Sequence, residues 1–94
     1  MFILRIEHPV SDFEGWKKAF ESDPVGRVRS GVRRYQISRP VDNKNYVLID
    51  LEFDTIQQAE ALLAAMRVVW SRVEGTIMTN PQTRIFELVE TREY

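Results

Sequence analysis

The sequence contains no cysteine and a single histidine, His8. The absence of cysteine excludes disulfides, thiolate nucleophiles, iron–sulfur clusters and cysteine zinc sites. A metal would have to be held by carboxylates, and no Asp or Glu residues show the spacing of a ligand set. We therefore expect no metal site and no cofactor, and His8 is the only side chain whose ordinary pKa lies near neutrality.

Long apolar runs and an excess of one charge are also missing. The longest apolar run, residues 61–66, is too short to span a bilayer. The net charge of −1 argues against binding to nucleic acid or to a membrane surface through bulk charge. The N-terminus lacks a basic region followed by an apolar stretch, so we expect no signal peptide and, by default, a cytoplasmic protein.

The 94 residues suffice for one domain, 1–94, with a small core. Alternation of apolar and polar residues predicts four strands: 1–8, 31–39, 46–53 and 83–93. Apolar residues at helical spacing predict a short helix that carries residues 13–20 and a helix of about five turns over 56–73.

Capping signals predict where the two helices begin and end. Ser11 and Glu14 fit a capping box at the start of the first helix, and Asp54 is expected to cap the second. Pro24 and Gly75 are the expected stop signals after the two helices.

The predicted order β-α-β-β-α-β is typical of a ferredoxin-like α+β fold, in which two helices cover one face of a four-stranded antiparallel sheet. The uncovered face should be polar, yet the last strand has apolar residues on both sides. A second copy related by a two-fold axis would cover this face, so we expect a homodimer through the sheet. The alternative is a small exposed apolar patch on a monomer.

Residues 7–20, "EHPVSDFEGWKKAF", carry a family resemblance. The stretch resembles the junction between first strand and first helix in antibiotic-biosynthesis-monooxygenase-like (ABM-like) proteins, many of them cyclase-like or uncharacterised. The resemblance implies a dimeric α/β barrel with a pocket between sheet and helices in each subunit. Activities on this scaffold include cofactor-free oxygenation of polycyclic phenols, haem degradation, polyketide cyclisation and lactone isomerisation. Haem degradation needs an iron-binding histidine on the second helix, and residues 54–74 contain none.

His8 is the candidate catalytic residue, as a base or as a polar anchor for the substrate, because deprotonation of a phenol or enol requires a base with a pKa near neutrality. In the proteins that the chain resembles, a histidine at this position belongs to the signature. The alternative is structural: the ring would hydrogen-bond the backbone where the strand meets the helix. A single titratable residue without a partner does not decide between the two.

Four further residues are candidates for substrate binding: Trp16, Tyr35, Met66 and Trp70. Aromatic and thioether side chains of this kind line pockets for flat ligands. The same residues at helical spacing also form the core between a helix and a sheet, and this alternative is the simpler one for Trp16.

Residues 27–39 contain five arginines and no acidic residue. They could bind an anionic ligand through bidentate hydrogen bonds, or pair with acids such as Asp50, Glu52 or Glu87 on neighbouring strands. Arg34 and Tyr35 must point to opposite faces of a strand.

Together these patterns predict a small cofactor-independent monooxygenase or cyclase that acts on an aromatic or polyketide-like molecule. The alternative is a non-catalytic small-molecule-binding or homodimeric assembly module. The sequence contains no paired acid and base, which favours the alternative, whereas the family resemblance around His8 favours an enzyme.

Overall fold

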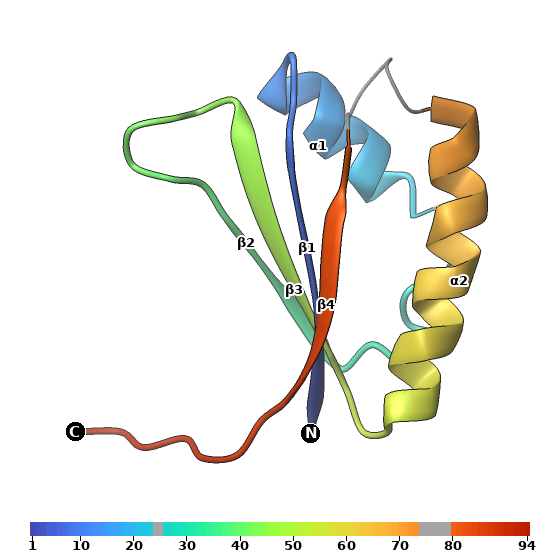
Figure 1. Cartoon of the computed structure of the whole chain (residues 1–94), viewed down its shortest axis with the longest axis vertical. Coiled ribbons are helices and arrows are strands. Elements are labelled where there is room, and N and C mark those ends of the chain that lie inside the picture. The colour runs from blue at the N-terminus through green and yellow to red at the C-terminus, as the bar shows by residue number, and fades with distance from the viewer. Residues whose placement is uncertain (24–25, 74–79) are drawn as a thin grey trace.

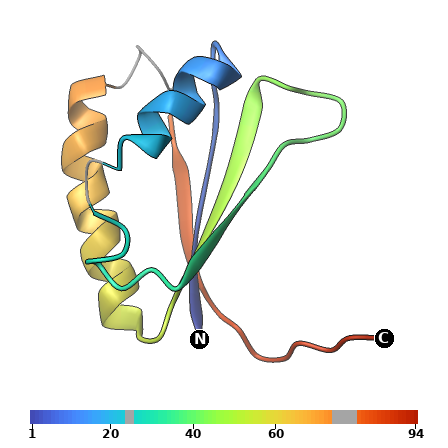
Figure 2. The same cartoon turned by 180° about the vertical axis from the view of Figure 1, so that it is seen from behind.

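The computed structural model describes residues 1–23, 26–73 and 80–94. Within these residues it contains six elements: β1 (Phe2–Pro9), α1 (Phe13–Glu21), β2 (Arg34–Ser38), β3 (Tyr46–Phe53), α2 (Ile56–Val73) and β4 (Gln82–Glu87). Both helices lie on one side of the sheet, as Figure 1 and the view from behind in Figure 2 show. The predicted ferredoxin-like α+β fold is confirmed.

The sheet is antiparallel throughout, and its strands have the spatial order β2-β3-β1-β4. Ile6 of β1 lies opposite Ile49 of β3 on one side and opposite Thr83 of β4 on the other. Residues opposite each other in an antiparallel pair project to the same face. The even-numbered residues of β1 therefore share a face with the odd-numbered residues of β3 and β4.

This shared face lies under the helices and forms the core. The largest fully buried side chains of the core are Leu4, Ile6, His8, Val47, Leu51, Phe53 and, from α2, Leu62. From α1, Trp16 and Phe20 complete the cluster. Burying one large apolar side chain of this kind contributes about 1.5–3 kcal/mol, so the alternation in β1 and β3 accounts for most of the fold's specificity.

The start of α1 differs from the predicted capping box. The N-cap is Asp12, whose carboxylate accepts a hydrogen bond of 3.1 Å from the Gly15 N–H. Ser11 lies before the cap, so its predicted role was wrong. Asp and Ser are equally good N-caps, and the sequence offers both in succession, which is why the prediction was off by one residue.

The start of α2 also differs by one residue from the prediction. Thr55 and Gln58 form a reciprocal capping box, in which each side chain accepts a 3.2 Å hydrogen bond from the other's backbone N–H. Asp54 is not the cap and instead pairs with Arg33 at 3.6 Å. The predicted stop signals Pro24 and Gly75 lie outside the described residues.

Strand β2 is shorter than predicted at its start. Gly31 has a φ of 96°, and a Cβ there would lie 2.6 Å from the side-chain nitrogen of Gln58. The chain is thus still turning at Gly31 and approaches α2 closely, and only glycine is suited to this position. Regular pairing with β3 begins at Arg34.

Strand β4 ends earlier than the predicted 83–93. The N–H of Leu88 donates to the Met1 carbonyl at 2.9 Å, after which the chain leaves the sheet. Its C-terminal residues run away from α2 in both views (Figures 1 and 2). Among the described residues, neither helix combines the length and apolar character needed to cross a membrane.

The face of the sheet opposite the helices is uncovered in the single chain. Arg5 donates two hydrogen bonds to Asp50, of 2.8 and 2.9 Å, and the Tyr46 hydroxyl donates to Glu7 at 2.9 Å. By register, apolar side chains also project to this open face: Ile3, Leu48 and Phe86. The open face is thus a mixture of paired charges and apolar side chains.

Candidate functional site

His8 lies near the end of β1, opposite Val47 of β3. Because it continues the even-numbered series of Leu4 and Ile6, its ring projects into the helix-covered core and is only 1% exposed. A polar ring in this position requires a hydrogen-bond partner. His8 therefore occupies a core position but carries a polar ring there.

The backbone selects the tautomer of His8. Its Nδ1 lies 3.0 Å from the Pro9 carbonyl oxygen, and a carbonyl only accepts, so Nδ1 carries the proton. The structural alternative for His8, a hydrogen bond to backbone, is thus present. The same bond leaves the lone pair on Nε2, which has no hydrogen-bond partner in the described part of the chain.

Burial lowers the pKa of His8 below its ordinary value, and the hydrogen bond to the Pro9 carbonyl opposes this shift only in part. The imidazole is therefore neutral at neutral pH. A neutral imidazole with an unpartnered Nε2 is able to accept a proton or a hydrogen bond from a ligand.

A continuous row of aromatic rings runs from His8 along α1 to β2. The edge of His8 meets Trp16 with ring centroids 6.0 Å apart, and Trp16 stacks on Phe20 at 5.3 Å. Phe20 then contacts Tyr35 edge to face at 5.0 Å. Trp16 and Phe20 are buried, whereas Tyr35 is 43% exposed, so the row leads from the core to the surface.

Arginines from the 27–39 segment pack against this row. The Arg27 guanidinium lies 4.0 Å from the centre of the Phe20 ring and 5.1 Å from that of Tyr35. It also donates to the Phe20 carbonyl at 2.8 Å and faces Asp23 at 3.5 Å. Arg34 pairs with Glu52. Arg27 and Arg34 thus pair with acidic residues of the chain itself, which is one of the two alternatives considered for residues 27–39.

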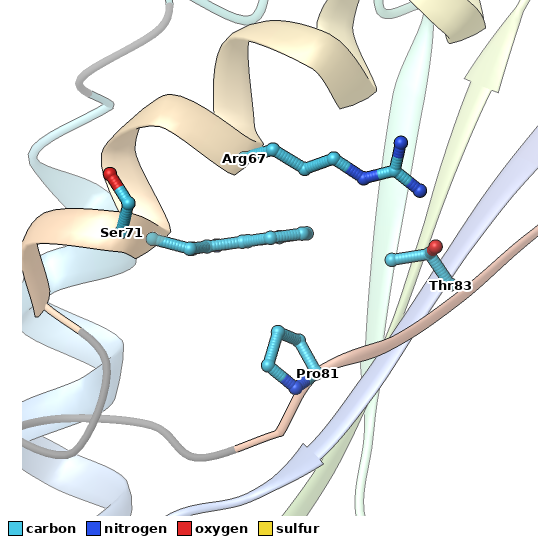
Figure 3. A pocket seen from close by; sticks show the side chains of 5 residues that line it. Arg67, Ser71, Pro81 and Thr83 are labelled. Carbon is cyan, nitrogen blue, oxygen red and sulfur yellow. The ribbon is translucent and has the colours of Figure 1, made fainter.

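A cleft of about 250 Å³ opens between the end of α2 and the start of β4. It is lined by Arg67, Trp70, Ser71, Pro81 and Thr83. Figure 3 shows the Arg67 guanidinium extending toward Thr83, with Ser71 at the other end and Pro81 facing the helix. Of the predicted substrate-binding residues, Trp70 lines this cleft, and Met66, one turn earlier, packs against the core.

The cleft and His8 belong to the same end of the sheet. The pairing of β1 with β4 ends at this end of the sheet with Ile6 opposite Thr83 and Glu7 opposite Gln82, and His8 and Pro81 follow just beyond the last pair. His8 is not among the residues that line the cleft. The structure thus places His8, Trp16 and Trp70 at one end of the domain but joins only His8 and Trp16 by direct ring contact.

Four residues of the cleft were not among the sequence candidates: Arg67, Ser71, Pro81 and Thr83. Arg67, Trp70 and Ser71 have the spacing i, i+3, i+4, so a shared helix face could have been read from the sequence. The contribution of β4 could not, because it depends on the register with β1. Among the described residues, no three His, Asp or Glu side chains are grouped in a way that could hold a metal ion.

The fold and this end of the sheet define the class of protein, a ferredoxin-like domain with a pocket between helix and sheet. The chain resembles SnoaB, a cofactor-independent oxygenase from Streptomyces nogalater, with a TM-score of 0.77 and 14% identity over 96% of this chain and 94% of that one. It is also similar to a provisionally assigned antibiotic biosynthesis monooxygenase from Nitrosomonas europaea, with a TM-score of 0.73 and 18% identity over 96% and 100%.

A third structure of the same fold is a dimeric ferredoxin-like protein from an uncultured marine organism, with a TM-score of 0.72 and 15% identity over 97% of both chains. Comparison with protein-family models gives no match, and neither does comparison with curated proteins. The structural matches confirm the resemblance to ABM-like proteins at the level of the fold. Identities this low do not carry an activity from one chain to another.

Proposed function

We propose that the chain is a small cofactor-independent monooxygenase-like or cyclase-like enzyme that acts on an aromatic or polyketide-like molecule. The observation that carries this proposal is His8, a buried neutral imidazole whose Nδ1 is held by Pro9 and whose Nε2 has no partner in the described residues. Such a group is a suitable general base for a phenol or an activated CH₂ group. The shared fold with SnoaB supports this kind of chemistry.

Both reactions begin with the same proton transfer to Nε2 of His8. In the oxygenase reaction the resulting carbanion passes electrons to O₂, the CH₂ group becomes a carbonyl, and the second oxygen atom leaves as water. In the cyclase reaction the enolate attacks a carbonyl of the same molecule and no oxygen is consumed. Neither route requires a metal or an organic cofactor from the protein.

The predicted substrate-binding residues receive different roles in this proposal. Trp70 would contact the ligand in the cleft, with Met66 beneath it on the same helix face. Trp16 would hold the His8 ring through their edge contact, as a positioning residue. Tyr35 would act only at the exposed end of the aromatic row.

Oxygen uptake and product analysis with a panel of small phenols, naphthols and short polyketide-like molecules test the proposal. His8→Asn should abolish turnover while its amide N–H still reaches the Pro9 carbonyl. Lys18→Gln, an exposed change on α1, is the control and should leave turnover unchanged. Turnover in His8→Asn equal to that of the wild type would exclude His8 as the base.

A non-catalytic binding module is the second candidate, and one observation favours it. His8 has no second titratable group within hydrogen-bond distance in the described residues, whereas general acid–base catalysis often uses a pair. A phenol that raises the melting temperature without giving product would support this candidate, since binding to the native state raises its stability.

We also propose that two copies associate through the open face. A sheet that carries Leu48 and Phe86 on its uncovered side needs a second layer, and its paired charges of both signs suit a two-fold interface. The ferredoxin-like protein from the uncultured marine organism is dimeric, which supports association of two copies. Light scattering at micromolar concentration should give twice 11.1 kDa, and a clean monomer would exclude it.

A further inference from the structure

The cleft between α2 and β4 combines apolar walls with an uncompensated cation. Trp70 and Pro81 supply apolar ring surfaces, and Arg67, Ser71 and Thr83 supply the polar groups. Its volume of about 250 Å³ is somewhat below the roughly 300 Å³ at which sites for small molecules usually begin. A ligand of one or two fused rings would therefore suit it better than a larger polycyclic molecule.

Arg67 differs from three arginines that form ion pairs with acids of β3 or the residue after it. Arg5 and Arg34 pair with acids on β3, and Arg33 pairs with Asp54. Arg67 has no carboxylate partner and no hydrogen bond within the described residues. Its planar guanidinium is therefore available for a bidentate contact with an anion from outside the chain.

The two hydroxyls of the cleft are not equivalent. The Ser71 hydroxyl already donates its proton to the Val68 carbonyl at 2.6 Å, so toward a ligand it is only an acceptor. The Thr83 hydroxyl makes no hydrogen bond within the described residues and is able to donate. Because Figure 3 shows the Arg67 guanidinium extending toward Thr83, the donors lie at one end of the cleft.

We infer that this cleft binds a small aromatic carboxylate. Arg67 and the Thr83 hydroxyl hold the carboxylate at one end, and the ring lies against Trp70 and Pro81. The site selects the anionic acid over its neutral amide, because only the acid compensates the charge of Arg67. This inference concerns binding alone and does not depend on any chemistry at His8.

Isothermal titration calorimetry with 2-naphthoate and its neutral analogue 2-naphthamide tests the inference on the unmodified protein. The carboxylate should bind about tenfold more tightly than the amide, as expected for a charge-assisted contact, and the difference should shrink as salt is added. Equal affinities, or no binding of naphthoate at millimolar concentration, would overturn the inference.

A matched pair of α2 variants locates the contact. Arg67→Gln should weaken naphthoate binding about tenfold and leave naphthamide unchanged. Arg72→Gln removes the same charge from the same helix at a residue that does not line the cleft, and it should bind naphthoate as the wild type does. If both variants lose the same affinity, general charge rather than Arg67 attracts the ligand and the inference fails. Thermal unfolding confirms that both variants are folded.

Thr83→Val tests the second donor without a change in charge or shape. Loss of the hydroxyl should weaken naphthoate binding about threefold and should have no effect in the Arg67→Gln background if both groups hold one carboxylate. Additive losses from the two variants would show that Thr83 contacts something else and would overturn its assigned role.

Discussion

The two faces of the sheet are built from the same strands but differ in how many polar side chains they carry and in the partners of those side chains. On the helix-covered face, β1 places Leu4 and Ile6 in the core and adds one polar residue, His8, which is 1% exposed. On the open face, the same strand alternates Ile3 with Arg5 and Glu7, and both charged residues find partners on β3.

The two faces therefore differ in whether their polar groups are already occupied by partners within the chain or are free to contact a ligand. Arg5 and Asp50 satisfy each other, and their bond raises the pKa of Arg5, so their hydrogen-bonding capacity is largely used. His8 uses one ring nitrogen on the backbone and leaves the other without a partner in the described residues. Among the described residues no fully buried side-chain nitrogen or oxygen lacks a hydrogen-bond partner, so Nε2 is not sealed inside the core and is within reach of a ligand.

The largest difference between the faces should appear when leucines of β3 are truncated. Leu51→Ala removes a fully buried side chain from the core and should lower the free energy of unfolding by about 3 kcal/mol. Leu48→Ala, the same change on the open face, should lower it by less than about 1 kcal/mol in the monomer. Urea denaturation of the two variants measures both values, and equal losses would contradict the assignment of faces.

Association should depend on the open face alone. Phe86→Asp places an unpaired charge in the proposed interface and should raise the dissociation constant of the dimer about a hundredfold. Val68→Asp adds the same charge to an exposed apolar position on α2 and should leave the dimer intact. Sedimentation analysis over a range of concentrations distinguishes them, and a dimeric Phe86→Asp variant would place the interface elsewhere.

His8 should behave as a core residue as well as a functional one. His8→Ala leaves a cavity beside Trp16 and removes their edge contact, so we expect a loss of about 2 kcal/mol. His8→Asn retains a donor for the Pro9 carbonyl and should lose about half as much. Thermal or urea unfolding checks both values. If alanine and asparagine cost the same, the hydrogen bond to Pro9 contributes nothing.

The fold could be predicted from the sequence because its two periodicities are clear. Alternation over 46–53 gives the whole of β3, and helical spacing gives α2 from Ile56 to Val73. The predictions were wrong at the ends of helices and strands. Before α1, for example, Ser11 and Asp12 are both good N-cap residues, and the sequence does not show which of them is the cap.

The candidate site was less predictable because it depends on contacts between distant segments. His8 continues the even-numbered series of Leu4 and Ile6, so the alternation could have placed it on the core face, although no such prediction was made. The direction of its free nitrogen depends on a backbone carbonyl, and the cleft depends on the register of β4 beside β1. Neither is encoded in periodicity, so Arg67 and Thr83 were found only in the structure.

The smallest expected effect is the change of the unfolding free energy with pH. It reports on the helix-covered face, because His8 lies there. Because burial lowers the pKa of His8 in the folded state, the unfolded chain takes up a proton first as the pH falls below about 6.5. The contribution of His8 to stability is thus complete above that pH. It decreases, by at most about 1.4 kcal/mol per pH unit, until the lowered folded pKa is reached.

Urea unfolding between pH 8 and pH 5 measures this slope, and His8→Asn is the control because it cannot titrate. All other titratable groups are common to both proteins, so their contributions cancel in the difference between the two curves. The difference between wild type and His8→Asn should therefore be constant above about pH 6.5 and change only below it. Parallel curves down to pH 5 would mean that the His8 ring is protonated as easily in the folded chain as in water, and the neutral base proposed for this face would be lost.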